Sequence, residues 1–199
     1  AAAVAARLAP LTQMVGIDFP TRVSDHGGIY VHKDREVPDT YATTVEYSDW
    51  YATLSASMAN AAGTQHLPTI VYGHEATISF VNGAIVVTPE YQFRKKFQEA
   101  TGKSEELVLE VDQKDISADH IADFLGCVRS REQPVFNAEF GKRVMTAIKM
   151  GVDSYREGRM LEWDSARAKV VKSSADRPGY EGDGLNHKEP PRRAPRPKA

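Results

Sequence analysis

Residues 117–164 read SADHIADFLGCVRSREQPVFNAEFGKRVMTAIKMGVDSYREGRMLEWD, and this stretch decides the fold. Its first part carries apolar residues at i, i+3, i+4 and i+7, the spacing of an amphipathic helix. These residues are Ile121, Phe124, Leu125 and Val128. A second helix is predicted from about Asn137, with Glu139 in its first turn, to Gly158, a residue type that commonly ends helices.

The residues before this helix pair have the pattern of β-strands. From Thr21 to Val87, β-branched and aromatic residues recur with period two between clusters of Gly, Pro, Asn and Asp. The clearest strands are 43–47, 51–58, the two arms 78–80 and 85–87 around Asn82-Gly83, the segment 107–111 and a short closing strand at 160–163. The sequence therefore predicts an α+β fold: an open, largely antiparallel sheet from about Thr21 to Val111 with the helices packed on one face.

Composition restricts the class of protein. The chain has 199 residues, 41% of them hydrophobic and 26% charged, which is typical of a globular protein. Its net charge of -2 gives no reason to expect a nucleic-acid partner. A lone cysteine, Cys127, cannot form an internal disulfide and favours a reducing compartment, so we expect a cytoplasmic protein. No apolar run reaches the length of a membrane span.

The predicted domain occupies residues 21–164. Residues 1–20 are alanine-rich, but Arg7, Pro10 and Gln13 interrupt them, and we interpret this segment as the remnant of a junction helix from a longer parent. Residues 165–199 are expected to be a tail rich in Pro, Gly and charge. Its last twelve residues carry five basic side chains against one acidic one, which fits a solvated linker or a segment that binds acidic partners.

The sequence lacks the common catalytic motifs. Gly182 and Gly184 lie in the tail with no strand before them, and Gly102-Lys103 lacks the earlier glycine of a phosphate loop. There is no G-x-S-x-G motif, Cys127 fits a small buried side chain better than a nucleophile, and the histidines have no metal-ligand spacing. We therefore assign no catalytic, cofactor-binding or metal-binding residue in this chain.

One segment, GGIYVHKDREVPDT at residues 27–40, is dense in functional side chains. Cations, carboxylates and an imidazole beside two glycines suit recognition of a polyol or a phosphate, or a contact between subunits. A solvated loop between two strands is the simpler explanation, and the sequence alone leaves both open. The candidate contact residues are His32, Lys33, Asp34, Arg35 and Glu36.

Several runs of the chain resemble a known family. They are GGIYVHKDREVPDTYATTVEY (27–47), SASMAN (55–60), VYGHEATISF (71–80) and residues 120–164, with the most specific pattern being F-L-x-C-x-R-S-R-x-Q-P followed by G-x-R. Over about Leu8 to Asp164 the chain resembles the C-terminal domain of Gfo/Idh/MocA-type oxidoreductases, the relatives of glucose-fructose oxidoreductase and inositol dehydrogenase. The tail RPGYEGDGLNHKEPPR (177–192) is also similar to the ends of such proteins.

The resemblance implies a two-domain parent whose N-terminal domain binds NAD or NADP. Family members transfer hydride to or from a sugar or cyclitol carbon, using a Lys in an E-K-P motif and a His in a D-x-x-x-H segment, and some cleave glycosides with a tightly held NAD. The chain has no E-K-P motif, since Lys188, Glu189 and Pro190 have the wrong order, and Ala1 to Arg7, near the expected domain junction, contain no His. We therefore expect this chain to hold no cofactor and to be inactive alone.

The sequence thus predicts the substrate-binding and oligomerisation part of an NAD(P)-dependent oxidoreductase acting on sugars or polyols. The alternative is a non-catalytic, dimerising interaction module derived from the same family. With helices on one side of the sheet only, we expect a homo-oligomer formed through the open sheet face. The aromatic residues expected on that face are some of Tyr41, Tyr47, Trp50, Tyr51 and Tyr72.

Overall fold

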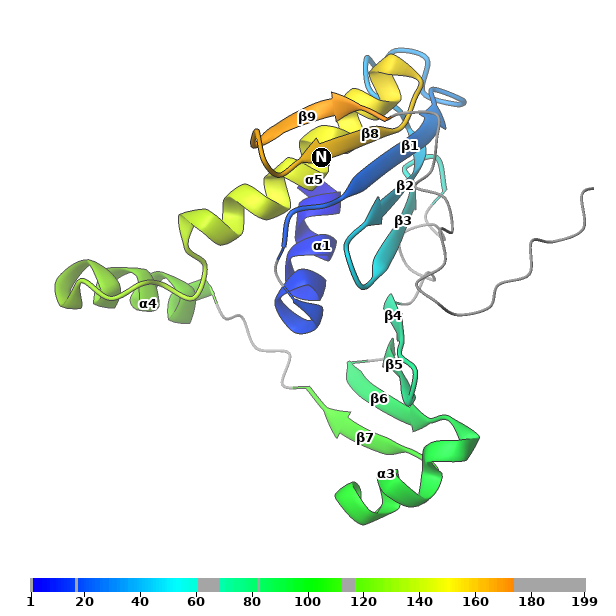
Figure 1. Ribbon diagram of the computed structural model, residues 1–199, viewed down its shortest axis with the longest axis vertical. Helices are drawn as coiled ribbons and strands as arrows, with labels where there is room; N and C mark the ends of the chain where they lie inside the picture. The colour runs from blue at the N-terminus through cyan, green and yellow to red at the C-terminus, as the bar shows by residue number, and fades with distance from the viewer. Residues whose placement is uncertain (1, 17, 61–68, 82, 112–116, 174–199) are drawn as a thin grey trace, which may run out of the picture.

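The computed structural model describes residues 2–16, 18–60, 69–81, 83–111 and 117–173, with residues 2–7 described as backbone only (Figure 1). The helical elements are α1 (Ala2–Val15), the 3-10 turn η1 (Tyr91–Phe93), α3 (Arg94–Thr101), α4 (Ser117–Ser130) and α5 (Ala138–Glu157). The strands are β1 (Arg22–Gly28), β2 (Thr40–Glu46), β3 (Tyr51–Ser57), β4 (Thr69–Tyr72), β5 (Ala76–Val81), β6 (Ala84–Pro89), β7 (Leu107–Glu110), β8 (Leu161–Asp164) and β9 (Lys169–Lys172).

The strands form two antiparallel sheets. The five-stranded sheet has the order β3-β2-β1-β8-β9, and the four-stranded sheet has the order β4-β5-β6-β7. The first uses β8 and β9 from the C-terminal side of α5, so α5 connects distant parts of the chain to the same sheet (Figure 1). The predicted α+β class and the open antiparallel architecture are confirmed.

The hydrophobic core lies between one face of the five-stranded sheet and the helices α1 and α5. Side chains alternate between the two faces of a strand, and the pairing places Val23 beside both Val45 and Leu161 on the inner face. All three are buried, together with Leu8 of α1 and Met150 of α5. The core cluster of the described residues draws on these elements and not on the four-stranded sheet.

Helix α5 begins and ends at the residues that the sequence indicates. The Asn137 side chain accepts a hydrogen bond from the Phe140 amide at 2.9 Å, which caps the first turn. Gly158 ends the helix with a φ of 64°, a conformation that favours glycine. Within the helix, Gly151 allows close packing on the sheet, because a Cβ at this position would lie 3.3 Å from Cγ2 of Thr43.

The position of α4 differs from the prediction. The helix at residues 117–130 forms as expected, but none of its side chains is buried, and it extends away from the five-stranded sheet (Figure 1). Only α1 and α5 contribute buried side chains to the helical side of the core. The amphipathic pattern correctly predicted a helix, yet that pattern does not specify which surface covers the helix.

Other differences concern the sheets and the tail. The strands expected in one sheet divide into two, and the helix α3 was not predicted. Strand β9 lies inside the segment expected to be a tail, where it pairs with β8, so the fold extends to at least Lys172. The predicted turn at Asn82-Gly83 lies partly outside the described residues, although Gly83 has the positive φ of 79° that such a turn requires. None of the helices in the described ranges combines the length and the apolar character that crossing a bilayer requires.

Candidate functional site

The segment rich in functional side chains forms the connection between β1 and β2. It joins Gly28 to Thr40, the last residue of one strand and the first of the next, at one end of the five-stranded sheet. Gly27 is required there, because a Cβ at this position would lie 2.4 Å from the carbonyl oxygen of Thr40. The loop is therefore held at both ends by the sheet.

Asp39 organises this loop from within. Its side chain is fully buried, and Oδ2 accepts three backbone hydrogen bonds, from the amides of Tyr30 (3.0 Å), Val31 (2.7 Å) and His32 (2.9 Å). These amide donors hold the pKa of the Asp39 carboxyl well below its usual range. The Asp39 backbone is fixed as well, since its amide donates to Gly28 O and its carbonyl accepts from the Met58 amide. The loop is thus a built structure rather than a free segment.

The five predicted contact residues lie together on this loop, at its surface. His32 is half-buried, and the other four, Lys33, Asp34, Arg35 and Glu36, are exposed. The Lys33 ammonium donates to the Ile29 carbonyl, and Nη1 of Arg35 lies 3.5 Å from Sδ of Met58. The loop therefore offers an imidazole, two cations and two carboxylates to an incoming molecule.

The outer face of the five-stranded sheet carries mostly hydroxyl side chains. The strand register places these residues in four rows across β1, β2 and β3. The rows are Arg22, Glu46 and Tyr51; Ser24, Thr44 and Thr53; His26, Ala42 and Ser55; and Gly28, Thr40 and Ser57. We call this surface the hydroxyl face.

Charged side chains close one end of the hydroxyl face. The Arg22 guanidinium lies 3.2 Å from Oε1 of Glu162 and 3.8 Å from Oε2 of Glu46. Beside this group, a shallow hollow of about 480 Å³ opens at the β2–β3 turn. It is lined by Thr44, Glu46, Tyr47, Asp49, Trp50 and Tyr51.

The hollow and the loop do not form one site. The hollow lies at the Glu46 end of β2 and the loop at the Thr40 end, so the strand of seven residues separates them by roughly 20 Å. Sequence reasoning missed the hollow, because its lining residues meet only after β2 and β3 pair. Hydroxyl, carboxylate and aromatic groups at the hollow are suited to binding polyols.

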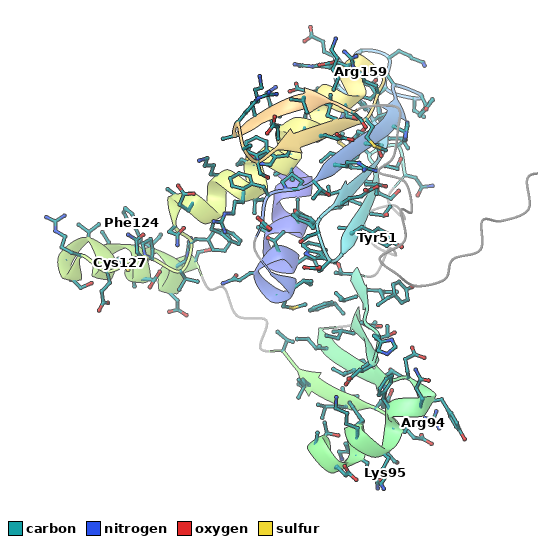
Figure 2. All side chains as sticks on the ribbon, in the orientation of Figure 1. Tyr51, Arg94, Lys95, Phe124, Cys127 and Arg159 are labelled. Carbon is teal, nitrogen blue, oxygen red and sulfur yellow. The ribbon has the colours of Figure 1, made fainter. Side chains whose placement is uncertain are left out.

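The expected aromatic surface differs from the observed one. Tyr51 lies on the hydroxyl face and is 71% exposed. Figure 2 shows its position on the edge strand β3. Tyr41 and Tyr47 belong to the inner side, where Tyr47 is buried and stacks on Trp50 at 4.1 Å. Tyr72 lies in the other sheet. The expectation of an aromatic outer face is therefore wrong for Tyr41, Tyr47 and Tyr72.

A carboxyl group lies on the inner face, beneath α5. Asp25 accepts a hydrogen bond from the Thr43 hydroxyl, and its amide donates to Oγ of Ser154 at 3.0 Å. Ser154 in turn donates to the carbonyl of Arg159 at 2.7 Å, so the cluster ties β1 to the end of α5. Burial raises the pKa of Asp25, and the Thr43 hydrogen bond only partly offsets this effect.

Asp25→Asn should remove the destabilisation that the charged Asp25 carboxylate causes in the folded wild type. A carboxyl whose pKa is higher in the folded chain stabilises the fold while protonated, and this contribution is lost as the pH rises above 3.8 through the raised value. Relative to the wild type, the variant should therefore be more stable at pH 7 than at pH 3. Denaturant titrations at both pH values measure this, with the exposed Asp49→Asn as the control. An equal difference at the two pH values would contradict the expectation.

Cys127 lies on α4, beside an acidic side chain. Sγ of Cys127 lies 4.0 Å from Oδ1 of Asp123, and desolvation, reinforced by the charge of Asp123, raises the pKa of the thiol. The thiol is therefore protonated at neutral pH. Within the described ranges, no group of three or more His, Cys, Asp and Glu side chains is arranged to hold a metal ion.

Comparison with protein-family models and with curated proteins gives no match. Solved structures do match the fold. An NAD-binding protein from Listeria innocua aligns with a TM-score of 0.55 and 16% identity, covering 78% of this chain and 48% of that protein. An oxidoreductase from Agrobacterium radiobacter, solved with NAD+, L-tartaric acid and magnesium, aligns with a TM-score of 0.58 and 10% identity over 77% of this chain and 46% of its own.

A UDP-N-acetylglucosamine 3-dehydrogenase from Acidithiobacillus ferrooxidans also matches, with a TM-score of 0.58 and 16% identity over 75% of this chain and 44% of the enzyme. The chain thus spans less than half of the length of each of these proteins. At these identities the likeness concerns the fold. The chain therefore shares the fold of part of each of these proteins, as the resemblance predicts.

Proposed function

We propose that this chain is the substrate-binding and oligomerisation part of an NAD(P)-dependent oxidoreductase that acts on sugars or polyols. One observation carries the proposal: the fold matches about three quarters of this chain to less than half of each of three neighbours, two of which are named with NAD. One neighbour is named for a nucleotide sugar and another was solved with a hydroxy acid, so both names involve hydroxylated molecules. The hydroxyl face and the charged loop supply matching hydrogen-bonding groups.

The nucleotide cofactor belongs, in this proposal, to a domain outside this chain. Hydride transfer requires the nicotinamide to be held against the substrate carbon, and this chain has no glycine-rich turn that could bind its phosphates. We further propose that the protein is cytoplasmic and forms a homo-oligomer through the hydroxyl face, which no helix of the described chain covers.

Calorimetric titration of the 199-residue chain with NADH and NADPH tests the cofactor assignment. We expect no binding at micromolar concentrations, because the phosphate-binding turn is absent. The same titration of a longer protein that includes a nucleotide-binding domain should show saturable binding. Micromolar affinity of the 199-residue chain for either dinucleotide would contradict the proposal.

The loop residues are the proposed contact with substrate or with a neighbouring subunit. In the longer enzyme, His32→Ala and Arg35→Ala should each reduce kcat/KM, or weaken the oligomer, by about tenfold to a hundredfold, as expected for the loss of one charge-assisted hydrogen bond. Steady-state kinetics and sedimentation measure the two effects, with Arg193→Ala in the basic tail as the control. Unchanged kinetics and an unchanged oligomer in both loop variants would identify a solvated loop.

A further inference from the structure

The hollow at the β2–β3 turn is lined mainly by aromatic rings and carboxylates. Its six lining residues are three aromatic residues, two acidic residues and one threonine: Tyr47, Trp50, Tyr51, Glu46, Asp49 and Thr44. None of the six is basic, and none carries an amide side chain. An anion would meet only like charges here, so the lining favours a neutral or a positively charged ligand.

The turn holds its rings in place before a ligand arrives. The Tyr47 amide donates to the Trp50 carbonyl at 2.8 Å, and the two rings stack with 4.1 Å between centroids. Tyr47 is only 6% exposed, and its hydroxyl has no hydrogen-bond partner among the described residues. A buried polar atom of this kind commonly has a water molecule or an ion nearby. The aromatic wall of the hollow is therefore preorganised.

Two of the rings keep surface that a ligand can reach. Tyr51 is 71% exposed on the edge strand β3 (Figure 2), and Trp50 remains partly exposed although Tyr47 covers one of its faces. In the part of the chain that the structure describes, the cations that lie over aromatic rings do so at Tyr91 and Phe19, away from this turn. The faces of Trp50 and Tyr51 are negative, which attracts a cation.

Carboxylates outnumber cations around the hollow. Glu46 and Glu162 share one guanidinium, that of Arg22, at 3.8 Å and 3.2 Å. Asp49 accepts a hydrogen bond from the Ser48 hydroxyl at 3.2 Å, and no cation of the described residues lies within ion-pair distance of it. Three carboxylates thus lie around one guanidinium, and the region is negative overall.

We propose that the hollow binds a small organic ammonium ion, with its alkyl groups against Trp50 and Tyr51 and its charge near Asp49 and Glu46. Such an ion gains from the ring faces and from the carboxylates together, whereas a neutral polyol gains hydrogen bonds alone. The site lies roughly 20 Å from the loop at residues 30–36. It is therefore separate from the contact with substrate proposed above, and it goes beyond the oxidoreductase function.

Titration of the full chain with choline, followed by NMR, gives the first test. Binding should be saturable, with a Kd on the order of 1 mM, and should shift the signals of the Trp50 indole and the Tyr51 amide. Dimethylbutanol, the neutral carbon isostere of choline, should shift the same signals with at least about tenfold weaker binding, and so should myo-inositol. Equal or tighter binding of either neutral compound at these signals would overturn the inference. The absence of choline binding would overturn it too, whether the chain is a monomer or an oligomer.

Variants at two exposed positions locate the site. Tyr51→Ala removes a ring and Asp49→Asn removes a charge, and each should weaken choline binding by about fivefold or more, whereas Tyr51→Phe should retain it. Tyr72→Ala in the other sheet and Asp34→Asn in the loop are the matched controls, because both positions are exposed, and they should leave the Kd unchanged. Choline binding that resists both Tyr51→Ala and Asp49→Asn would show that the ion binds elsewhere and would overturn the inference.

Discussion

Met150→Ala should lower the free energy of unfolding by about 2–5 kcal/mol, the range found when a large buried side chain is truncated in a packed core. Met150 has no exposed surface, and it lies in the cluster that joins α1, α5 and the five-stranded sheet. Its removal leaves a cavity that neighbouring side chains fill only partly. Denaturant titration followed by circular dichroism measures the loss.

Met145→Ala is the matched control, because the same residue type occurs on the same helix with 54% of its surface exposed. This substitution should change the unfolding free energy by less than about 0.5 kcal/mol. Equal losses in the two variants would contradict the description of α5 as a helix with one buried face.

Asp39→Asn should release the loop between β1 and β2. An amide side chain keeps the shape of the carboxylate but carries no charge, so the three backbone donors of Tyr30, Val31 and His32 lose a charge-assisted acceptor. Hydrogen exchange at these three amides should accelerate by about tenfold or more, while exchange in α5 stays slow. Exchange measured by NMR or mass spectrometry reports both regions.

Lowering the pH should release the loop in the same way as Asp39→Asn, because protonation also removes the charge of Asp39. Because the pKa of Asp39 is lower in the folded chain, its contribution to stability is present above the usual pKa of 3.8 and is lost as the pH falls below that value. Asp34→Asn, at an exposed position of the same loop, is the control and should leave the exchange pattern unchanged. Unaltered exchange in Asp39→Asn would show that the loop is ordered by its strand connections alone.

The sequence predicted best what local signals determine. Asn137 and Gly158 identify the ends of α5 because capping depends on residues next to one another in the chain, and the period-two pattern around Thr43 and Val45 gives β2 for the same reason. The antiparallel class then follows from short connections between strands.

Features that depend on distant contacts could not be predicted in this way. The apolar stripe of α4 shows that the helix needs a cover, but no local rule says whether that cover is the five-stranded sheet. Asp39 could be placed in the loop, yet its role depends on three amides that reach it only when the chain folds back at residues 30–32. The hollow near Tyr51 likewise requires the pairing of β2 with β3.

The hydroxyl face and the apolar stripe of α4 differ in how their burial changes the heat capacity. Burying serine and threonine hydroxyls exchanges one set of hydrogen bonds for another and changes the heat capacity little or raises it, whereas burying phenylalanine, leucine and valine lowers it strongly. Cooling weakens the second kind of contact much more than the first. Cooling would therefore weaken any contact made by the apolar stripe of α4 more than one made by the hydroxyl face.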